Sequence, residues 1–167
     1  MFGLLSKKKN DNSKNSELTL IAPGDGTLIP LANVPDPVFA EKMAGDGVAI
    51  DLTGDVIVAP ADGELSLVFK TKHAFALTLE TGIELLVHIG LETVALNGEG
   101  FEQLVEAGTI VKAGTPIIKI DRSFIQSKGC SLITPILITN PDITKSITPV
   151  ENTKAICGTT VAIKYTV

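Results

Sequence analysis

Residues 21–28, Ile-Ala-Pro-Gly-Asp-Gly-Thr-Leu, return 37 residues later as residues 58–65, Val-Ala-Pro-Ala-Asp-Gly-Glu-Leu. In both segments a short apolar run enters and leaves an Asp-Gly turn, where glycine supplies the positive φ that tight turns require. Two interpretations remain open, namely two similar hairpin turns or a duplicated half-domain. Both interpretations predict a strand, a turn and a second strand at each place.

The rest of the chain continues this alternation of short apolar segments with Gly, Asp, Asn or Pro. Only 4% of the residues are aromatic, while Val, Ile and Thr are abundant, which is typical of a strand-and-turn protein. The sequence therefore predicts an all-β fold, an antiparallel β-sandwich of two sheets packed face to face. Strands are expected near residues 18–23, 26–31, 47–52, 55–59, 64–69, 74–79, 83–89, 109–112, 116–121, 132–139 and 159–166.

Helical signals are few. Residues 101–107 and 122–128 each precede a glycine, which is a common helix stop, and predict one or two short peripheral helices. Residues 111–117 resemble a turn of biotinyl and lipoyl carriers. Those carriers need a lysine in a Met-Lys-Met or Asp-Lys-Ala tripeptide, which this turn lacks.

The chain length of 167 residues and the 44% hydrophobic content suit one domain with a single core. We expect this domain to span residues 18–167, after a flexible N-terminal tail formed by residues 1–17. In the tail, an apolar cluster of Phe2, Leu4 and Leu5 precedes three lysines at 7–9. The tail is either a solubilising segment or a peripheral contact to anionic membranes, which attract such cations.

No apolar run approaches the roughly 20 residues needed to cross a bilayer, and no signal-peptide core follows the N-terminus. The protein is therefore expected to be cytoplasmic, with Cys130 and Cys157 as free thiols. Residues 1–17 contain four lysines, Asp11 and Glu17, and so carry a charge of +2. Because the whole chain has a net charge of −5, residues 18–167 carry −7. An acidic body disfavours nucleic acid and favours a basic partner protein.

The chain has two histidines, His73 and His88, and both lie in apolar segments on either side of the turn at 80–82. A hairpin whose loop has two or four residues places the two imidazoles on one face, roughly 5 to 8 Å apart at Cβ. A loop with an odd number of residues would separate them. We prefer the even loop, because two convergent imidazoles suggest shared chemistry.

Two imidazoles can share a metal, or one can carry a phosphoryl group while the other donates a hydrogen bond to its oxygens. A closed zinc site needs four ligands, or three and a water, and no cysteine lies close in the sequence. This ligand count argues against a zinc hydrolase. Phosphoryl transfer requires a nucleophile, nearby donors such as Thr71, and backbone that can approach closely, as at Gly90.

Several segments resemble the glucose-type IIA component of the bacterial phosphoenolpyruvate-dependent sugar phosphotransferase system. The resemblance covers nearly everything after the tail. Its most specific parts are residues 34–50, 58–63, 71–75, 84–96 and 98–101.

The resemblance implies that His88 is phosphorylated, that His73 is its phosphate-stabilising partner, and that Thr71 orients His73. It also implies a partner-binding surface with an apolar rim and two acids outside it, formed by Asp36, Val38, Phe39, Met43, Phe69, Leu86, Glu92 and Val94. Met43, Ala44, Leu86 and Glu92 depart from the usual residues of the family, which bears on partner preference rather than on chemistry.

The function implied by the resemblance is phosphoryl carriage from phospho-HPr to a cysteine of a IIB domain during sugar uptake. No cofactor and no metal are expected. An alternative is a regulator whose phosphorylation state is read by target proteins, and members of the family often do both. The transported sugar and the oligomeric state are not encoded in these patterns.

Overall fold

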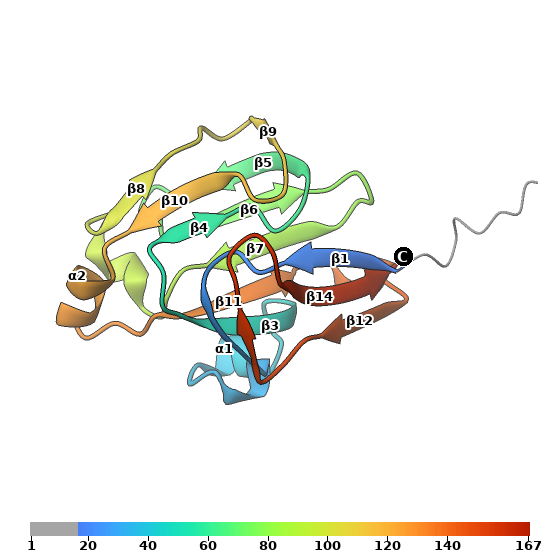
Figure 1. Cartoon of the computed structure of the whole chain (residues 1–167), viewed down its shortest axis with the longest axis horizontal. Coiled ribbons are helices and arrows are strands. Elements are labelled where there is room, and N and C mark those ends of the chain that lie inside the picture. Colours follow the sequence, from blue (N-terminus) through green and yellow to red (C-terminus); the bar gives the residue numbers. More distant parts are fainter. Residues whose placement is uncertain (1–16) are drawn as a thin grey trace, which may run out of the picture.

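The computed structural model describes residues 17–167, which form an almost entirely β-stranded body (Figure 1). The strands are β1 (Leu18–Ile21), β2 (Gly26–Ile29), β3 (Asp46–Leu52), β4 (Val56–Val58), β5 (Gly63–Val68), β6 (Ala74–Thr78), β7 (Glu84–His88), β8 (Phe101–Gln103), β9 (Ile110–Val111), β10 (Pro116–Ile120), β11 (Ile133–Ile138), β12 (Ser146–Pro149), β13 (Thr153–Ala155) and β14 (Val161–Thr166). The helices are α1 (Pro37–Ala40), α2 (Arg122–Ser127) and three 3₁₀ turns, η2 (Leu31–Asn33), η3 (Thr93–Leu96) and η4 (Pro141–Ile143).

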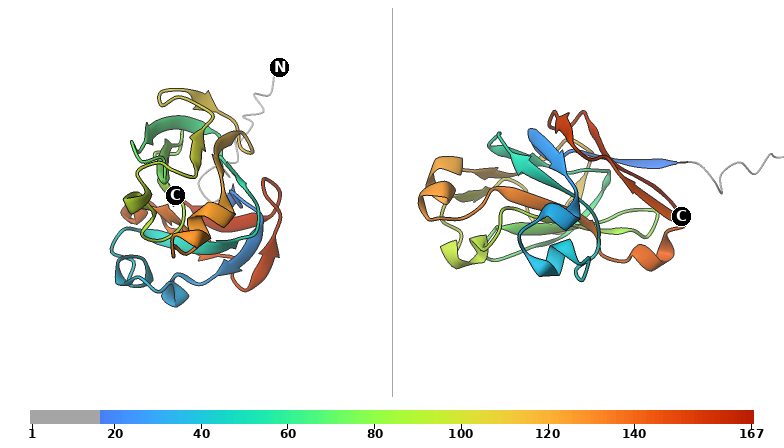
Figure 2. Two further views of the ribbon diagram at one scale, coloured as in Figure 1. Left: turned by 90° about the vertical axis from the view of Figure 1, so that its left-hand side faces the viewer. Right: turned by 90° about the horizontal axis from the view of Figure 1, so that it is seen from below.

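All described strand pairs are antiparallel, and they form one sheet of eight strands and two sheets of three. The large sheet has the order β13-β2-β3-β11-β7-β6-β5-β9, and the small sheets are β1-β14-β12 and β4-β10-β8. Apolar side chains from all three sheets meet in one core, and α2 lies at one end of the body (Figure 2). The predicted antiparallel β-sandwich with two short helices is confirmed, with the small layer split into two sheets.

The two repeated turns hydrogen-bond to each other reciprocally. The N–H of Ile21 donates to the carbonyl of Pro60 at 2.9 Å, and the N–H of Val58 donates to the carbonyl of Pro23 at 2.8 Å. Each donor in one turn corresponds to the other donor 37 residues along the chain. Such an exchange has twofold symmetry, and it favours the interpretation as a duplicated half-domain.

The turn aspartates make equivalent contacts in the two halves. Asp25 Oδ1 accepts from the N–H of Cys157 at 2.7 Å, and Asp62 Oδ1 accepts from the N–H of Ala113 at 2.8 Å. Since Asp62 also approaches the ammonium of Lys112 at 3.5 Å, its carboxylate ties the turn of residues 111–116 to the second repeat.

The predicted helix over residues 101–107 is wrong. Phe101–Gln103 forms β8, which pairs with β10, and the N–H of Leu104 donates to the carbonyl of Ile117. Phe101 is buried by this pairing, so tertiary contacts override a local preference for helix. The predicted helix over 122–128 is confirmed as α2, whose N-terminus is capped by Asp121.

The strands β12 and β13, the helix α1 and the three 3₁₀ turns were not predicted. The strands β12 and β13 are short, and Pro149 and Asn152 interrupt the apolar alternation on which strand prediction depends. The helix α1 has only four residues, which is too short for a periodic pattern; Asp36 caps it by accepting from the N–H of Val38 at 3.0 Å.

The predicted register of the histidine hairpin is also wrong. β6 and β7 pair Ala74 with His88 and Thr78 with Glu84, so the loop between these strands has five residues, an odd number. His73 therefore precedes the first paired residue of β6. Lys72 adopts a left-handed backbone with φ 57°, and the strict alternation of faces does not apply to the residue that follows it.

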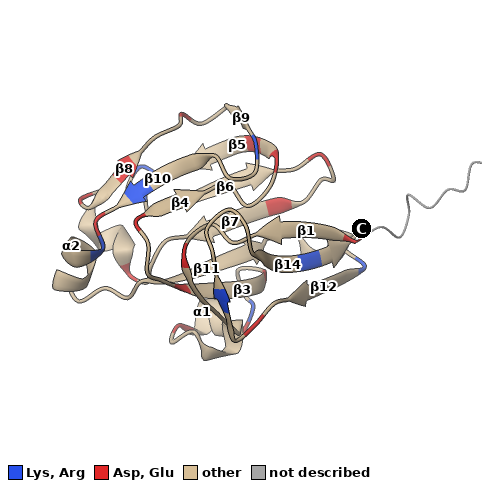
Figure 3. Ribbon diagram, viewed as in Figure 1, with Lys and Arg blue, Asp and Glu red and all other residues tan. Residues whose placement is uncertain are grey.

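The predictions for the N-terminal tail lie outside the described residues. No helix between residues 17 and 167 is long and apolar enough to span a membrane. Figure 3 shows Lys and Arg residues dispersed over β10, β14 and α2 in this view, among acidic positions at strand ends and turns. The basic residues of the described body therefore form no continuous stripe on the face shown.

Candidate phosphoryl-transfer site

His73 and His88 meet at the end of the β6–β7 hairpin that is opposite to its loop. Their ring centroids are 5.0 Å apart and the ring planes are nearly perpendicular, at 81°. His73 is 3% exposed, whereas His88 is half-buried. The pair therefore presents one accessible imidazole beside one enclosed imidazole.

Each histidine has one ring nitrogen in a short hydrogen bond. His88 Nδ1 lies 2.8 Å from the carbonyl oxygen of Gly90, and His73 Nδ1 lies 2.5 Å from Thr71 Oγ1. Because a carbonyl only accepts, His88 carries its proton on Nδ1 and keeps a lone pair on Nε2. A threonine hydroxyl can donate, so Thr71 can leave the proton of His73 on Nε2.

Burial lowers the pKa of both imidazoles, since the charged form loses solvation. The pKa of His73 falls to about 4, first through desolvation and then through the neighbouring His88. The pKa of His88 is lowered by desolvation, against the opposing effects of the Gly90 carbonyl, its own backbone and the carboxylate of Asp36. At neutral pH the site therefore holds two uncharged imidazoles, one of them with a free nitrogen lone pair.

Aromatic side chains flank the pair on both sides. Phe39 lies against His88 with ring centroids 5.0 Å apart, and Phe69 contacts His73 edge-on at 5.3 Å. Phe39 comes from α1, which packs against η2, and η2 in turn contacts β3. These contacts cover one side of each ring, and His88 keeps part of its surface exposed.

The surface around the histidines is apolar and shallow. Val38 and Met43, from the segment that carries Phe39, and Val94, from η3, are 43%, 63% and 53% exposed. An open hollow of about 510 Å³ next to His73 is lined by Leu67, Val68, Phe69, Lys70, Thr71, His73 and Val94. Such a surface suits a protein partner better than a small ligand, because it has an apolar centre without depth.

Two carboxylates stand beside this surface. Asp36 and Glu92 line a smaller hollow of about 200 Å³, together with Pro35, Leu91, Gly129 and Ser131. Glu92 has a left-handed backbone, with φ 60°, where the chain turns into η3. The two acids give the edge of the apolar surface a negative charge.

Comparisons with known proteins agree with this geometry. The sequence model of the family described as phosphoenolpyruvate-dependent sugar phosphotransferase system, EIIA 1, matches residues 18–144. The chain belongs to this family. Membership in the EIIA family implies phosphoryl transfer in sugar uptake, and it gives the two histidines a chemical context.

Three relatives illustrate the similarity. The chain is 48% identical over 166 residues to the PTS system glucose-specific EIIA component of Bacillus cereus, covering 99% of this chain and 96% of that protein. It is 49% identical over 142 residues to the glucose-specific EIIBCA component of Corynebacterium glutamicum, covering 85% of this chain and 21% of that protein. The solved glucose permease IIA of Mycoplasma capricolum superposes with a TM-score of 0.83 at 41% identity, covering 89% of this chain and 96% of that chain.

Most of the residues singled out from the sequence lie in this one place. His73, His88, Thr71, Phe39 and Phe69 are in contact as a connected set. Phe39 is only 7% exposed, so it belongs to the wall behind His88 rather than to the open surface, and Leu86 is half-buried in the same small core cluster.

Sequence reasoning missed Leu67, Thr93 and Thr134. Leu67 is 49% exposed on β5, where the strand interior gave no sign of exposure. Thr93 and Thr134 are fully buried hydroxyls close to Gly90. A threonine in an apolar strand signals that a buried hydroxyl needs a partner, although the sequence does not say which partner.

No group of three or more His, Cys, Asp or Glu side chains within residues 17–167 is arranged to hold a metal ion. The histidine pair by itself offers two nitrogen ligands, fewer than a zinc site uses.

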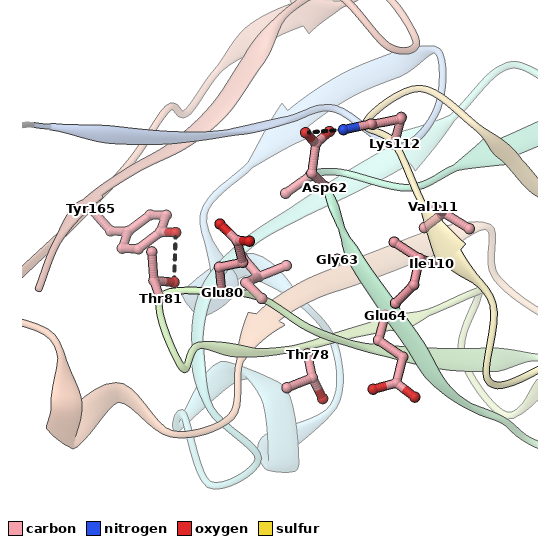
Figure 4. A pocket seen from close by; sticks show the side chains of 12 residues that line it. Asp62, Gly63, Glu64, Thr78, Glu80, Thr81, Ile110, Val111, Lys112 and Tyr165 are labelled. Carbon is pink, nitrogen blue, oxygen red and sulfur yellow. Dashed lines mark hydrogen bonds and ion pairs between the residues drawn. The ribbon is translucent and has the colours of Figure 1, made fainter.

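A second hollow, of about 490 Å³, lies at the other end of the β6–β7 hairpin (Figure 4). Its lining combines apolar side chains such as Leu79 and Ile110 with polar ones, among them Asp62, Glu64, Glu80 and Thr81. The hydroxyl of Thr81 lies 3.3 Å from that of Tyr165. It contains no histidine and no cysteine. The hollow beside His73 has a similar volume, about 510 Å³, so size alone does not distinguish the two places.

Proposed function

We propose that this chain is a phosphoryl carrier of a glucose-type sugar phosphotransferase system, which accepts a phosphoryl group from phospho-HPr on His88 and passes it to a cysteine of a IIB domain. The observation that carries the proposal is the hydrogen bond from His88 Nδ1 to the Gly90 carbonyl, which leaves Nε2 free beside a neutral His73. The glucose-specific names of the relatives support the sugar class.

In the accepting step, the Nε2 lone pair of His88 attacks the phosphorus atom of phospho-HPr. A P–N bond to His88 forms as the P–N bond to HPr breaks, and the electron pair of that bond returns to the HPr nitrogen. The His88 ring gains positive charge, and the Gly90 carbonyl stabilises it through the retained Nδ1 proton. Catalysis in such an exchange rests mainly on positioning.

His73 stabilises the phosphoryl group on His88 and does not itself attack phosphorus. With Thr71 donating to Nδ1, the proton on Nε2 of His73 is available to the phosphate oxygens. In the donating step, a cysteine thiolate of the IIB domain attacks phosphorus, so that an S–P bond forms and the P–N bond to His88 breaks. The lone pair then returns to His88 Nε2, which restores the carrier.

The docking surface for both partners is the exposed apolar set of Val38, Met43 and Val94, with Asp36 and Glu92 at its edge. Burial of the apolar set holds the partner, while the acids steer a basic partner and make association depend on salt. The Corynebacterium relative, whose name combines B, C and A components in one chain, supports a IIB partner. The proposed site of action is the cytoplasm, next to the transporter.

The test is incubation with the general phosphotransfer proteins and phosphoenolpyruvate, followed by intact-mass measurement. The wild-type chain should gain one phosphoryl group that is labile in acid and stable in alkali. His88→Ala should gain none, and a phosphoryl group on that variant would refute the assignment. His73→Gln should accept the group but pass it on slowly, because an amide donates a hydrogen bond without the proton balance of imidazole.

A further inference from the structure

Among residues 17–167, the buried polar residues besides the core tyrosine are His73, Thr93 and Thr134. His73 belongs to the site described above. The other two, here called the threonine pair, are each 0% exposed and come from different elements, Thr93 from η3 and Thr134 from β11. Both hydroxyls contact the same peptide unit, the one that joins Ile89 to Gly90.

The contacts fall on opposite sides of that peptide. Thr93 Oγ1 donates to the carbonyl of Ile89 at 2.6 Å, and the N–H of Gly90 donates to Thr134 Oγ1 at 3.1 Å. The hydroxyl of Thr134 donates in turn to the carbonyl of Leu132 at 3.0 Å, so its own proton is also satisfied. A peptide is planar, so holding its oxygen and its N–H together fixes the orientation of the plane.

The next peptide unit holds the carbonyl that contacts His88. The N–H of Leu91 donates to the carbonyl of Ser131 at 3.1 Å, and the oxygen of Gly90 faces His88 Nδ1 at 2.8 Å. Gly90 itself has φ 72°, a left-handed conformation that a glycine adopts without strain. With both flanking peptides held, the Gly90 carbonyl has little freedom to rotate away from the imidazole.

We propose that Thr93 and Thr134 are positioning residues for phosphoryl transfer, because together they hold the Ile89–Gly90 peptide so that the Gly90 carbonyl keeps the His88 proton on Nδ1. The inference rests on the proposed role of His88. Loss of either hydroxyl frees one side of the peptide, the carbonyl then leaves Nδ1 more often, and the proton can move to Nε2. A protonated Nε2 has no lone pair with which to attack phosphorus.

The experiment compares Thr134→Val and Thr93→Val, which keep the side-chain shape, with Thr134→Ser and Thr93→Ser, which keep the hydroxyl. Ile136→Val is the matched control, because Ile136 is a fully buried neighbour on β11 whose shortening disturbs packing without removing a hydrogen bond. Three quantities are measured for each full-length variant: the His88 tautomer by ¹⁵N NMR, the rate of phosphoryl acceptance from phospho-HPr, and the thermal midpoint.

The valine variants should show a raised population of Nε2-protonated His88 and accept phosphoryl about tenfold more slowly, the size expected for one lost hydrogen bond. The serine variants should restore both values, and Ile136→Val should change only the thermal midpoint. Valine variants that keep the Nδ1 tautomer and the wild-type rate would overturn the proposal, as would equal slowing in Ile136→Val at matched stability. If a valine variant fails to fold, its serine counterpart and the other valine variant decide.

The tautomer measurement separates this proposal from the proposed function. An Nδ1-protonated His88 in a wild-type chain that accepts no phosphoryl group would refute the carrier role and leave the positioning contacts intact. A wild-type chain that accepts the group, with valine variants unchanged in tautomer and rate, would refute the positioning role alone.

Discussion

The two halves of the large sheet share one strand order and differ in the connections between their strands. The large sheet has the order β13-β2-β3-β11-β7-β6-β5-β9, with β11 and β7 at its centre. Counted outward from the centre, β11 matches β7, β3 matches β6, β2 matches β5 and β13 matches β9. In one half, residues 30–45 connect β2 to β3 and carry η2 and α1. In the other half, the connection between β5 and β6 is only residues 69–73.

The strand registers identify the counterpart of His88. Leu28 and Leu65 are equivalent in the repeated segments; they pair with Ile50 and Leu77, which pair in turn with Thr134 and Leu85. Three residues further along the last two strands are Leu137 and His88.

Leu137 is 0% exposed, in a cluster with Leu31, Val34 and Phe39 from the long connection. His88 is half-buried, because the short connection of its own half does not cover it. From the long connection, the ring of Phe39 packs against His88 and the carboxylate of Asp36 acts on its charge. The two halves therefore share a symmetric set of strands, and the unequal lengths of their connections leave His88 partly exposed while Leu137 is buried.

The largest expected effect on phosphoryl acceptance comes from replacing His88 on β7 with leucine, the residue found at the equivalent position 137 of β11. His88→Leu should abolish phosphoryl acceptance completely while leaving the thermal midpoint near the wild-type value, since the ring already lies against Phe39. Intact mass after phosphotransfer and circular dichroism give the two readings. Leu137→Met, a volume-conserving change in the other half, should accept phosphoryl normally. A phosphorylated leucine variant would break the comparison.

The second prediction concerns the glycine that follows the histidine strand. Gly90 stands where the other half has Thr139, and a Cβ on it would lie 2.6 Å from the Ser131 oxygen and 2.7 Å from Thr93 Cγ2. Gly90→Ala should therefore lower the free energy of unfolding by about 3 kcal/mol and slow phosphoryl acceptance. Gly82→Ala is the control at the other end of β7, where φ is 87° but the nearest atom is 3.5 Å away.

For Gly82→Ala the free energy of unfolding should fall by only about 1 kcal/mol, which is the cost of placing alanine in a left-handed backbone conformation without a steric clash. Urea denaturation measures both values. Equal losses in the two variants would show that the space around Gly90 can relax and that its contacts do not constrain the site.

The third prediction concerns pH. His73 stands where the other half has Asp46, a carboxylate paired with Lys42 at 3.3 Å. Because burial lowers the pKa of His73 from 6.5 to about 4, the unfolded chain binds more protons than the native chain between these values. Stability should therefore rise with pH across this window and fall as the solution is acidified, by at most about 3 kcal/mol from this residue.

The measurement is urea denaturation from pH 4 to pH 7. His73→Gln should flatten most of the slope, and the remaining part should come from His88, whose pKa is lowered in the same direction. A slope that is unchanged in His73→Gln would assign the acid sensitivity to carboxylates instead.

The smallest expected effect tests the symmetry itself. Asp25→Ala and Asp62→Ala should each lower the thermal midpoint slightly and by similar amounts, because each removes a carboxylate that accepts a hydrogen bond from a backbone N–H. Thermal denaturation compares the two variants directly. Costs that differ by much more than the value of one hydrogen bond would show that the two turns are not energetically equivalent.

Local chemistry made the fold class and the candidate residues readable from the sequence. The Asp-Gly turns, the runs of Val, Ile and Thr, and the glycine after residues 122–128 act over a few neighbours, so each strand or helix they mark can be predicted in isolation. His73 and His88 were singled out as the two histidines of the chain, both in apolar segments, and the resemblance to the glucose-type IIA family supplied the role of Thr71.

Partners distant in the sequence decided the rest. The strand at Phe101–Gln103 exists because β10 pairs with it, and the loop length of the β6–β7 hairpin depends on how both strands pack on the core. A register that was predicted to separate the histidines instead leaves His73 just outside β6, where the left-handed Lys72 redirects it toward His88.

The sequence by itself determined an all-β chain with a repeated turn and two histidines in apolar segments, since these depend on local backbone preferences and on composition. Only the tertiary structure decided that Leu137 and His88 occupy equivalent places, and that Thr93 and Thr134 hold one peptide between them. The physical reason is that buried polar groups must find partners in space. For the N–H of Gly90, that partner is Thr134 on β11, 44 residues further along the chain.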